Sequence, residues 1–352
     1  MASSTQLAVS IIIPTAWADD GLRRCLLSVT RANPPASEVV VAVDGADSAA
    51  CDMAASFGAL VVTTPVRGGP SGARNVGAQA ARGDILFFVD SDVLIPSDAV
   101  ARVQEAFAAR PDLAAIFGSY DDEPDAPNFL SQYKNLLHHY VHQTGREDAS
   151  TFWAGCGAIR KEALKAVGGF DTAYQTPSME DIELGYRLRA AGRKIRLVKS
   201  LQVKHLKHWT AGTLLRADFL ARALPWSRLI LKSGVLINDL NINRVSRLCA
   251  VLVYGLLLTL GLAVRWPRLL WMALVQVVAL LALNWPLYRF FWRKRGLLFA
   301  LAVVPWHWFY YFYGALAFGI AWLVHLFGRP ESQPVSPLNS SSPREGNVDG
   351  GG

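Results

Sequence analysis

Acidic residues are missing from a long stretch near the C-terminus, and this constrains the fold more than any other feature of the sequence. Between Leu248 and Phe327 the chain contains no Asp or Glu. Three apolar segments fill this stretch, at residues 248–264, 266–288 and 297–327. A helix needs roughly 20 apolar residues to cross the hydrocarbon core of a bilayer. The sequence therefore predicts three transmembrane helices, with a buried helical hairpin as the alternative.

Charge is divided unevenly along the chain. Residues 1–203 carry 19 Lys and Arg against 23 Asp and Glu, whereas residues 204–327 carry 14 against 2. A basic excess beside membrane helices favours contact with anionic lipid, whereas a nucleic-acid partner would require basic charge on the soluble domain. By the positive-inside rule, the large N-terminal domain then lies in the cytoplasm. We expect an integral protein of the inner or plasma membrane that has no nucleic-acid partner.

Short apolar strands alternate with amphipathic helices in the first half of the chain. Strands are expected at residues 8–13, 39–43, 60–63, 85–89 and 114–118. This alternation is typical of a parallel sheet in the α/β class, for which nucleotide binding is the common use. The glycine fingerprint of hydride-transferring dehydrogenases is absent, which argues against that chemistry.

Composition divides the rest of the chain. Residues 1–208 are expected to form the catalytic domain, and residues 209–247 an amphipathic, basic juxtamembrane connector before the membrane helices of residues 248–327. The tail at residues 328–352 is rich in Ser, Pro and Gly, which predicts disorder. The four cysteines are scattered, so neither a zinc site nor a disulfide framework is predicted.

Two carboxylates stand directly after the predicted strand at residues 85–89, at Asp90 and Asp92. Ligands of open α/β sheets bind outside the carboxyl ends of the strands, which places both acids in a binding cleft. Hard oxygen ligands suit Mg²⁺ or Mn²⁺, and such an ion keeps coordination positions for the phosphates of a nucleotide. The alternative is an Asp-rich turn.

Further polar residues at this sheet edge suit the other parts of a nucleotide. Asp44 and Asp47 follow the second predicted strand, where a carboxylate can accept from a base N–H or a ribose hydroxyl. A glycine-rich segment that opens a helix lies between Arg67 and Arg74. Backbone amides and arginines of this kind suit a diphosphate, although a flexible turn with solvated arginines is the alternative.

Several short motifs in one order produce a resemblance to a known family. They cover about residues 8–210, and they are a strand with Pro14, Val43-Asp44-Gly45, Gly72-Ala73-Arg74-Asn75, Asp90-Ser91-Asp92, Gly155-Cys156-Gly157 with Arg160, Gly168-Gly169-Phe170-Asp171 and Glu180-Asp181. In this order they resemble the family-2 glycosyltransferases, which have the GT-A nucleotide-sugar fold. The resemblance implies inverting transfer of one sugar from a nucleotide donor, with a metal ion at the Asp-x-Asp motif.

The resemblance also implies roles for single residues. Asp44 would contact the nucleoside, Asp90 the ribose or the metal, and Asp92 the metal that bridges the diphosphate. The residues implied in nucleotide-sugar binding are Pro14, Asp44, Asp47, Arg67, Arg74, Asp90 and Gly155. His205 lies near where similar enzymes bring a late histidine to the metal, which makes it a third expected ligand; a locally satisfied histidine is the alternative.

Glu180 and Asp181 are the expected catalytic acids. They begin a predicted helix that runs to Ala191, and its free N–H groups and dipole would hold the Asp181 carboxylate ionised, as a general base requires. Asp181 is the predicted base that deprotonates the acceptor, and Glu180 is expected to orient or replace it. The alternative is that both acids only stabilise the helix N-terminus.

The acceptor side offers fewer signals. Trp153 would stack on a sugar or pack in the core. Processive members of the family carry a Gln-x-x-Arg-Trp signature before the membrane, whereas this chain has only Arg222 and Trp226 there. Three transmembrane helices would also line little of a channel for a polysaccharide. Because a lipid phosphate needs no base, the Glu180-Asp181 pair favours a hydroxyl acceptor on a lipid or glycolipid.

The sequence therefore predicts a membrane-anchored, inverting glycosyltransferase that uses a nucleotide-diphosphate sugar and Mg²⁺ or Mn²⁺. A polyprenyl-phosphate glycosyltransferase is an alternative, with Lys204, Lys207 or Arg222 near the lipid phosphate. A processive polysaccharide synthase and a nucleotidyltransferase are two more. A nucleotide-binding membrane protein without turnover is the non-enzymatic alternative.

Overall fold

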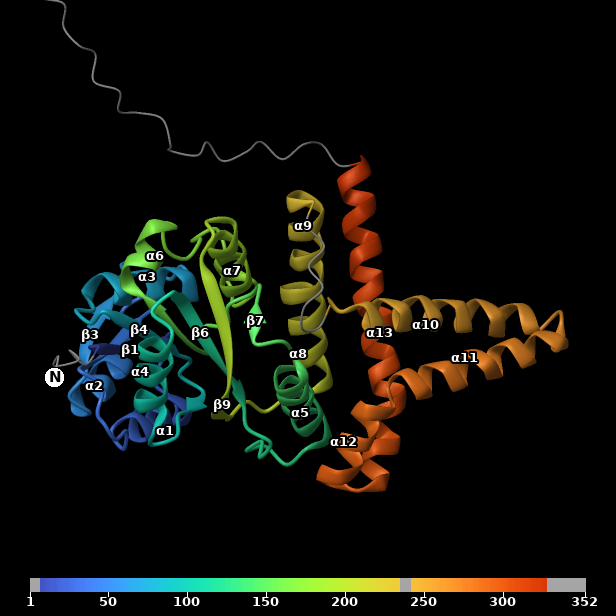
Figure 1. Cartoon of the computed structure of the whole chain (residues 1–352), viewed down its shortest axis with the longest axis horizontal. Helices are drawn as coiled ribbons and strands as arrows, with labels where there is room; N and C mark the ends of the chain where they lie inside the picture. Colours follow the sequence, from blue (N-terminus) through green and yellow to red (C-terminus); the bar gives the residue numbers. More distant parts are fainter. Residues whose placement is uncertain (1–6, 235–241, 328–352) are drawn as a thin grey trace, which may run out of the picture.

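An α/β domain occupies the N-terminal part of the chain, and long helices follow it (Figure 1). A computed structural model describes residues 7–234 and 242–327; the predicted disordered tail lies outside these residues. The strands of the domain are β1 Val9–Thr15, β2 Glu38–Val43, β3 Leu60–Thr63, β4 Ile85–Val89, β5 Val93–Leu94, β6 Leu113–Tyr120, β7 Asp148–Ala149, β8 Cys156–Arg160 and β9 Lys194–His205.

Within the described residues the sheet has nine strands, in the order β3-β2-β1-β4-β8-β6-β9-β5, with β7 beside β9. Strands β3, β2, β1 and β4 are parallel, as the sequence predicted, and their carboxyl ends share one edge. Strand β8 runs antiparallel between β4 and β6, and it was not predicted. The last strand, β9, is long and runs from Lys194 to His205.

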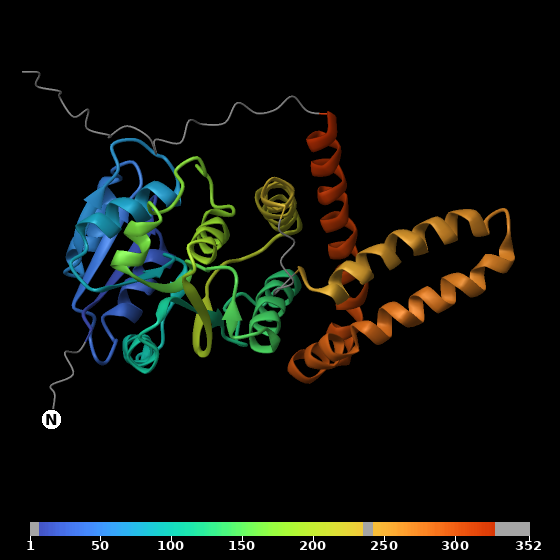
Figure 2. The same ribbon diagram turned by 45° about the horizontal axis from the view of Figure 1, so that its top comes forward.

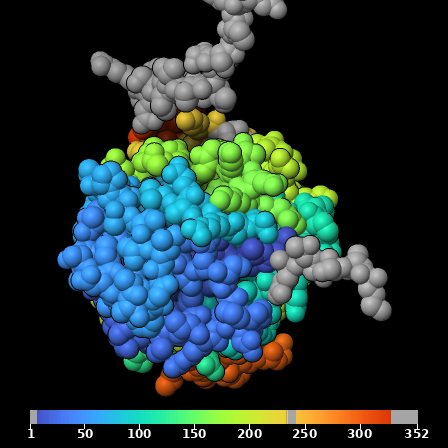
Figure 3. All heavy atoms as spheres, turned by 90° about the vertical axis from the view of Figure 1, so that its left-hand side faces the viewer, coloured from blue at the N-terminus to red at the C-terminus, as the bar shows by residue number. Residues whose placement is uncertain are grey.

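Helices cover both faces of the sheet because side chains alternate along each strand. From β4, Phe87 packs on the face of α1 and α4, and Phe88 packs on the opposite face, toward α3 and α7. The space-filling view of Figure 3 shows that the N-terminal half of the chain forms the surface farthest from the C-terminal helices. The helices of this domain are α1 Asp20–Val29, α2 Ser48–Ser56, α3 Pro70–Ala80, α4 Ala99–Ala109, α5 Phe129–Thr144, α6 Lys161–Ala166 and α7 Glu180–Ala190.

Residues 211–233 of the predicted connector form a continuous helical segment that includes one stretch of π-helix, whereas residues 235–241 lie outside the described residues and residues 244–247 begin the next helix. It comprises α8 Ala211–Leu215, the π-helix η1 Arg216–Ala223 and α9 Leu224–Ser233, and Gly234 caps it in the left-handed conformation. Figures 1 and 2 both show α9 beside the last helix of the chain, α13 Leu297–Phe327. The connector is thus packed between the sheet domain and the C-terminal helices.

In the part of the chain that the structure describes, two helices are long and apolar enough to cross a membrane, α10 Arg244–Ala263 and α13. The second predicted span, residues 266–288, is not one straight helix. It is divided into a 3₁₀ turn at Pro267–Leu269, α11 Leu270–Leu283 and α12 Trp285–Arg295, with a bend of 61° at Asn284. If this bent pair is counted as one broken span, residues 7–234 and 242–327 contain up to three candidate spans.

The hairpin of α10 and α11 projects sideways from α13 in both Figure 1 and Figure 2. The three predicted spans therefore do not form a bundle of parallel helices. At its base the hairpin packs on α13 through Cys249, Val253 and Tyr311. A second apolar cluster joins α5 to α12 and α13, with Leu136, Phe291 and Val303 among its buried members. This cluster fixes the C-terminal helices to the sheet domain.

Candidate active site

Two carboxylates leave the sheet at the end of β4. Because β4 is fully buried and ends at Val89, Asp90 and Asp92 emerge at the edge where β1 and β2 also end, as the sequence predicted. The chain turns at this point, and the Val93 N–H donates to the Asp90 carbonyl at 3.0 Å. Val93 then pairs with His205, which brings the end of β9 beside Asp92.

Arg74 joins Asp90 to Glu180. Its side chain comes from α3, is 4% exposed, and donates to Asp90 Oδ1 and Glu180 Oε1, both at 2.8 Å. One buried guanidinium therefore forms ion pairs with both carboxylates and holds them close together. The prediction that Arg74 contacts a diphosphate remains a prediction, because both of its terminal nitrogens already bind carboxylates. Glu180 is also 4% exposed, and its carboxylate is bound by Arg74, which suits a residue that orients its neighbours.

Asp92 and His205 form a close pair. The His205 Nε2 atom lies 3.5 Å from Asp92 Oδ2, and the His205 Nδ1 atom lies 2.9 Å from the Asn135 side-chain oxygen. Burial by itself would raise the pKa of Asp92, but the charge and hydrogen bond of His205 lower it to about 2. Asn135, on α5, was missed by the sequence analysis. His208 is exposed and takes no part.

Asp181 stands in the first turn of α7, which begins at Glu180 as predicted. Its Oδ2 atom accepts a hydrogen bond from the Ala154 N–H at 3.1 Å. Burial and the nearby Glu180 charge raise the pKa of Asp181 to about 7. The expectation that the helix N-terminus keeps this carboxylate fully ionised is therefore wrong, because burial outweighs the dipole. A group with a pKa near neutrality is nevertheless suited to general base catalysis.

The end of β2 carries Asp44, whose carboxylate organises the glycine-rich loop before α3. It is buried and accepts from the N–H groups of Gly68 and Gly69 and from the Thr64 hydroxyl, each at 2.9 Å. Gly69 has a φ of +84°, and a Cβ there would lie 2.1 Å from the Gln175 carbonyl oxygen. Only glycine fits this turn. Asp44 thus fixes the loop that starts α3.

Four other predicted binding residues have local structural roles. Asp47 caps α2 by accepting from the Ala50 N–H at 2.8 Å. Pro14 is a buried residue of β1. Gly155 is required because a Cβ would lie 2.8 Å from the Trp153 ring. The exposed Arg67 lies over the Trp17 ring, 4.9 Å from its centroid. The sequence analysis missed Trp17, whose ring is about half exposed.

A cluster of aromatic side chains lies between the acids at the sheet edge and the backbone of α5. Tyr120, from the end of β6, stacks on His205 with ring centroids 4.4 Å apart and meets Trp153 edge-on at 4.8 Å. His138 lies 4.7 Å from the Trp153 ring, and its Nδ1 atom is buried without a hydrogen-bond partner. Trp153 is therefore part of this cluster and is only half-buried, so both of its predicted roles stay open.

A buried carboxylate connects the sheet domain to the C-terminal helices. Asp218, on η1, is 5% exposed and accepts from Lys134 at 2.6 Å, from Tyr313 at 3.0 Å and from Arg222 at 3.1 Å. The Arg222 side chain is partly exposed, and Asp218, Tyr120 and Asp181 raise its pKa. One feature of the sequence could have indicated this cluster: Asp218 is one of only two acidic residues in residues 204–327.

Trp226 is the last predicted acceptor-side residue. Its indole N–H donates to the Tyr186 hydroxyl at 3.0 Å, which joins α9 to α7. Since α7 also carries Asp181, this contact positions the connector against the helix of the candidate base.

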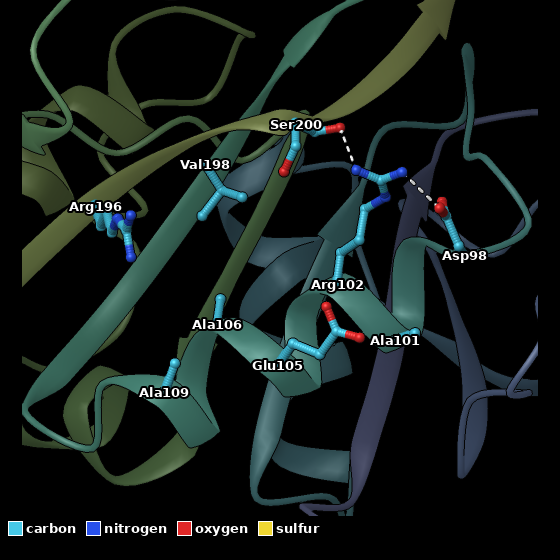
Figure 4. A pocket seen from close by; sticks show the side chains of 9 residues that line it. All are labelled: Asp98, Ala101, Arg102, Glu105, Ala106, Ala109, Arg196, Val198 and Ser200. Carbon is cyan, nitrogen blue, oxygen red and sulfur yellow. Dashed lines mark hydrogen bonds and ion pairs between the residues drawn. The ribbon is translucent and has the colours of Figure 1, made fainter.

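The groove shown in Figure 4 lies elsewhere, between α4 and the middle of β9. Its volume is about 490 Å³, and no predicted site residue lines it. Arg102 crosses the groove and donates to Asp98 at 2.6 Å and to the Ser200 carbonyl at 2.9 Å. This groove therefore belongs to the outside of the domain, and the candidate site is the cluster of acids at the sheet edge.

The sheet with acids at its carboxyl edge agrees with a comparison of the sequence with known families. The model of glycosyl transferase family 2 matches residues 10–168. Most of the sheet domain is therefore similar to glycosyl transferase family 2. A second model, for the N-terminal domain of galactosyltransferase, matches residues 136–209. The predicted family and GT-A fold are thus confirmed.

Curated glycosyltransferases are similar to this chain in sequence. A pre-mycofactocin glycosyltransferase of Mycobacterium tuberculosis is 28% identical over 222 residues, which cover 58% of this chain and 44% of that protein. An uncharacterized glycosyltransferase of Haemophilus influenzae is 24% identical over 192 residues, which cover 51% of this chain and 61% of that protein. The chain therefore spans about half the length of these curated relatives.

A solved structure shares the fold over most of the chain. The mannosyltransferase of Pyrobaculum calidifontis, in complex with GDP-Man and Mn²⁺, is 17% identical with a TM-score of 0.55, and the match covers 92% of this chain and 88% of that chain. Such coverage extends beyond the sheet domain into the C-terminal helices.

Proposed function

We propose that this glycosyl transferase family 2 protein moves one sugar from a nucleotide-diphosphate sugar to a hydroxyl group of a membrane lipid or glycolipid, with inversion. One observation carries the proposal. The Asp92–His205 pair and the half-buried Asp181 lie at the same sheet edge and are linked through the Asp90–Arg74–Glu180 bridge. A candidate metal site and a candidate base are therefore held in one rigid frame.

The Asp92–His205 pair fits a divalent cation, Mg²⁺ or Mn²⁺. When His205 donates its Nδ1–H to the Asn135 oxygen, the lone pair of Nε2 points toward Asp92, and an oriented histidine of this kind is typical of metal sites. In residues 7–234 and 242–327, no three His, Cys, Asp or Glu side chains are grouped to hold a metal ion alone. Diphosphate oxygens of the donor would complete the coordination, and the bound cation would stabilise the leaving diphosphate.

The residues of this chain would supply the remaining steps. Asp44 and the loop that it fixes would bind the nucleoside end, with Trp17 and Arg67 at the exposed side. Asp181 would take the proton of the acceptor hydroxyl as its oxygen bonds to the anomeric carbon. The bond from that carbon to the diphosphate breaks at the same time, and the nucleoside diphosphate leaves with the electron pair. A single displacement of this kind inverts the anomeric centre.

Membrane association is the second part of the proposal. Helix α10 has 20 residues, which span about 30 Å at 1.5 Å per residue, close to the thickness of a bilayer core. Basic residues cluster at the end of α12, at Arg293, Lys294 and Arg295. By the positive-inside rule these residues and the catalytic domain would lie on the cytoplasmic side of the inner or plasma membrane.

A lipid phosphate is the second candidate acceptor, and the position of Arg222 favours it. The Arg222 guanidinium binds Asp218 through one nitrogen and lies within electrostatic range of Asp181. Its remaining N–H groups would suit a phosphate oxygen. A phosphate acceptor would need no base, so this candidate predicts a small effect of Asp181→Asn and a large effect of Arg222→Gln on transfer.

Release of nucleoside diphosphate tests the proposal. The purified full chain would be incubated with UDP-, GDP- or dTDP-sugars and Mn²⁺, with and without a membrane-lipid extract, and the anomer of the product would be read by NMR. We expect release from one donor that requires lipid, stops with EDTA and gives the inverted anomer. Release of pyrophosphate would instead identify a nucleotidyltransferase, and a retained anomer would contradict the single displacement.

A further inference from the structure

A second cavity lies at the base of the α10–α11 hairpin. Its volume is about 420 Å³, and ligand pockets typically measure roughly 300 to 1,000 Å³. Residues of α5, the start of α10, the α11–α12 bend and α13 line it, and no residue of the candidate active site is among them. The proposed transfer reaction therefore gives this cavity no function.

The polar groups in its wall bind one another. The His307 ring accepts or donates at both nitrogens, to the Tyr133 hydroxyl at 2.9 Å and the Tyr311 hydroxyl at 3.0 Å. The Tyr311 hydroxyl also donates to the Asn284 side-chain oxygen at 2.7 Å. Since these groups are already paired, they have little need of a polar ligand. The rest of the lining combines the apolar side chains of Leu137, Val141, Val245, Leu283, Pro286 and Leu287 with the polar residues Tyr140, Thr144, Asn243, Arg244, Ser246 and Tyr310.

Two helices supply the apolar wall. Leu137 and Val141 stand one turn apart on α5, and Leu283 and Leu287 stand one turn apart across the α11–α12 bend. A narrow space between two such rows suits a hydrocarbon chain, whose burial is favoured in proportion to the apolar area removed from water.

The mouth of the cavity carries a cation. Arg244 is the first residue of α10, is exposed, and lines the cavity beside Val245. If α10 crosses the bilayer as proposed, Arg244 stands at the depth of the lipid headgroups and the apolar part of the helix begins one turn later. A cation at this depth attracts an anionic headgroup.

We propose that this cavity binds an anionic membrane phospholipid, with one acyl chain between α5 and the α11–α12 bend and the phosphate at Arg244. The proposal rests on the proposed membrane location of α10 and not on the transfer reaction. The bound chain would support α5, whose other side provides Asn135 to His205 and Lys134 to Asp218. The lipid would thus stabilise the helix that connects the hairpin to the candidate active site.

Photolabelling of the full chain tests the proposal. The purified protein would be placed in mixed micelles with phosphatidylglycerol that carries a diazirine in one acyl chain, irradiated, and mapped by mass spectrometry. We expect label on the α5 segment at residues 137–144, because α5 is not a candidate membrane span and lipid around the hairpin would not reach it. The same acyl chain on phosphatidylcholine should label this segment less.

Two variants localise the lipid. Arg244→Gln should lower phosphatidylglycerol labelling of α5 about fivefold, the effect of one basic residue at an anionic headgroup, and should leave phosphatidylcholine labelling unchanged. Val141→Trp should remove the α5 label by filling the cavity, whereas Val278→Trp, on the exposed side of α11, should retain it. Arg244→Gln changes an exposed residue, so it keeps the test valid if Val141→Trp does not fold.

Three results would overturn the proposal. One is the absence of label on α5 in the unmodified protein. Another is equal labelling of α5 by phosphatidylglycerol and phosphatidylcholine that is also unchanged in Arg244→Gln. This result would mean that no lipid phosphate binds at Arg244. The third is a folded Val141→Trp protein that is labelled like the parent, which would mean that the lipid only surrounds the hairpin. None of these readouts depends on sugar transfer, so failure here is distinguishable from failure of the proposed function.

Discussion

At the scale of single residues, the site is organised by charge pairs. Arg74 forms ion pairs with Asp90 and Glu180, and His205 lowers the pKa of Asp92. Asp181 has no such cation in direct contact, and its pKa rises to about 7. Environments that separate the pKa values of neighbouring carboxyls are typical of acid–base assignments in enzymes. Because its pKa is near neutrality, Asp181 is the acid suited to proton transfer.

The first prediction concerns Asp181. Asp181→Asn should keep donor binding and lower the rate of transfer about 10²- to 10⁴-fold, the usual contribution of a general base. Glu183→Gln is the matched control, since Glu183 lies in the same turn of α7 and pairs only with Arg187. The measurement is nucleoside-diphosphate release together with donor affinity by calorimetry. Transfer at the parental rate would identify a different base or a phosphate acceptor.

The second prediction concerns pH. Because the pKa of Asp181 is raised to about 7, its carboxyl is protonated and unable to act as a base in acid. The value of kcat/KM should therefore rise with pH through about 7 and then level off. The measurement is a pH profile at saturating Mn²⁺, in which the residual activity of Asp181→Asn should lack this rise. A flat profile of the parent protein would exclude Asp181 as the titrating group.

The third prediction concerns the Asp92–His205 pair. Asp92→Asn and His205→Ala should each weaken donor binding in Mn²⁺ by about tenfold or more, as expected for loss of one ligand, and should leave metal-free binding unchanged. The measurement is calorimetry with and without EDTA. His208→Ala is the control, because His208 is an exposed histidine close to His205 in the sequence. Unchanged Mn²⁺-dependent affinity in both variants would remove the pair from the metal site.

At the scale of elements, the joint between the sheet domain and the C-terminal helices depends on one carboxylate. Asp218 connects η1 to Lys134 of α5 and to Tyr313 of α13. The π-helical stretch lies at this joint, and π-helical turns are frequent at functional sites because they redirect side chains. The same joint sets the position of Arg222 relative to Asp181.

A stability measurement tests this joint. Asp218→Asn leaves the half-buried Lys134 without its charge partner, which should lower the free energy of unfolding by about 3 kcal/mol. Tyr313→Phe removes only one hydrogen bond to the carboxylate and should cost about 1.5 kcal/mol. Arg228→Gln, on the same connector, is the control. Thermal unfolding in detergent should follow this order, and an Asp218→Asn protein as stable as the control would contradict the role of the joint.

At the scale of the whole molecule, an acid-rich sheet domain is attached to an apolar hairpin that projects away from it (Figures 1 and 2). Most of the outward side chains of α10 and α11 are apolar, and Arg265 and Arg268 stand at the hairpin tip. An apolar surface of this extent would be unstable in water and is typical of a surface that faces lipid. Crossing of the membrane by the hairpin would place the tip and the catalytic domain on opposite sides.

Cysteine labelling tests that arrangement. Arg268→Cys at the hairpin tip should react with a membrane-impermeant maleimide in intact cells, because the tip would lie outside. Glu105→Cys, an exposed position on α4, should react only after the cells are permeabilised. Labelling of both positions, or of neither, in intact cells would contradict the proposed topology.

The sequence by itself determined the class of the fold and the acids at the sheet edge. Alternation of apolar residues, a strand that ends in Asp90 and Asp92, and the acid-free segment are local patterns, and they determine strand direction and apolar helices without knowledge of distant contacts. The order of motifs then indicated family 2.

Only the tertiary structure decided the contacts between distant residues. The extension of β9 to His205, the pairing of Arg74 with Glu180 and the Asp218 joint each connect residues 70 or more positions apart. The raised pKa of Asp181 and the bend at Asn284 depend in the same way on what packs around them. Burial and charge pairing act through space, and short-range sequence patterns carry little information about them.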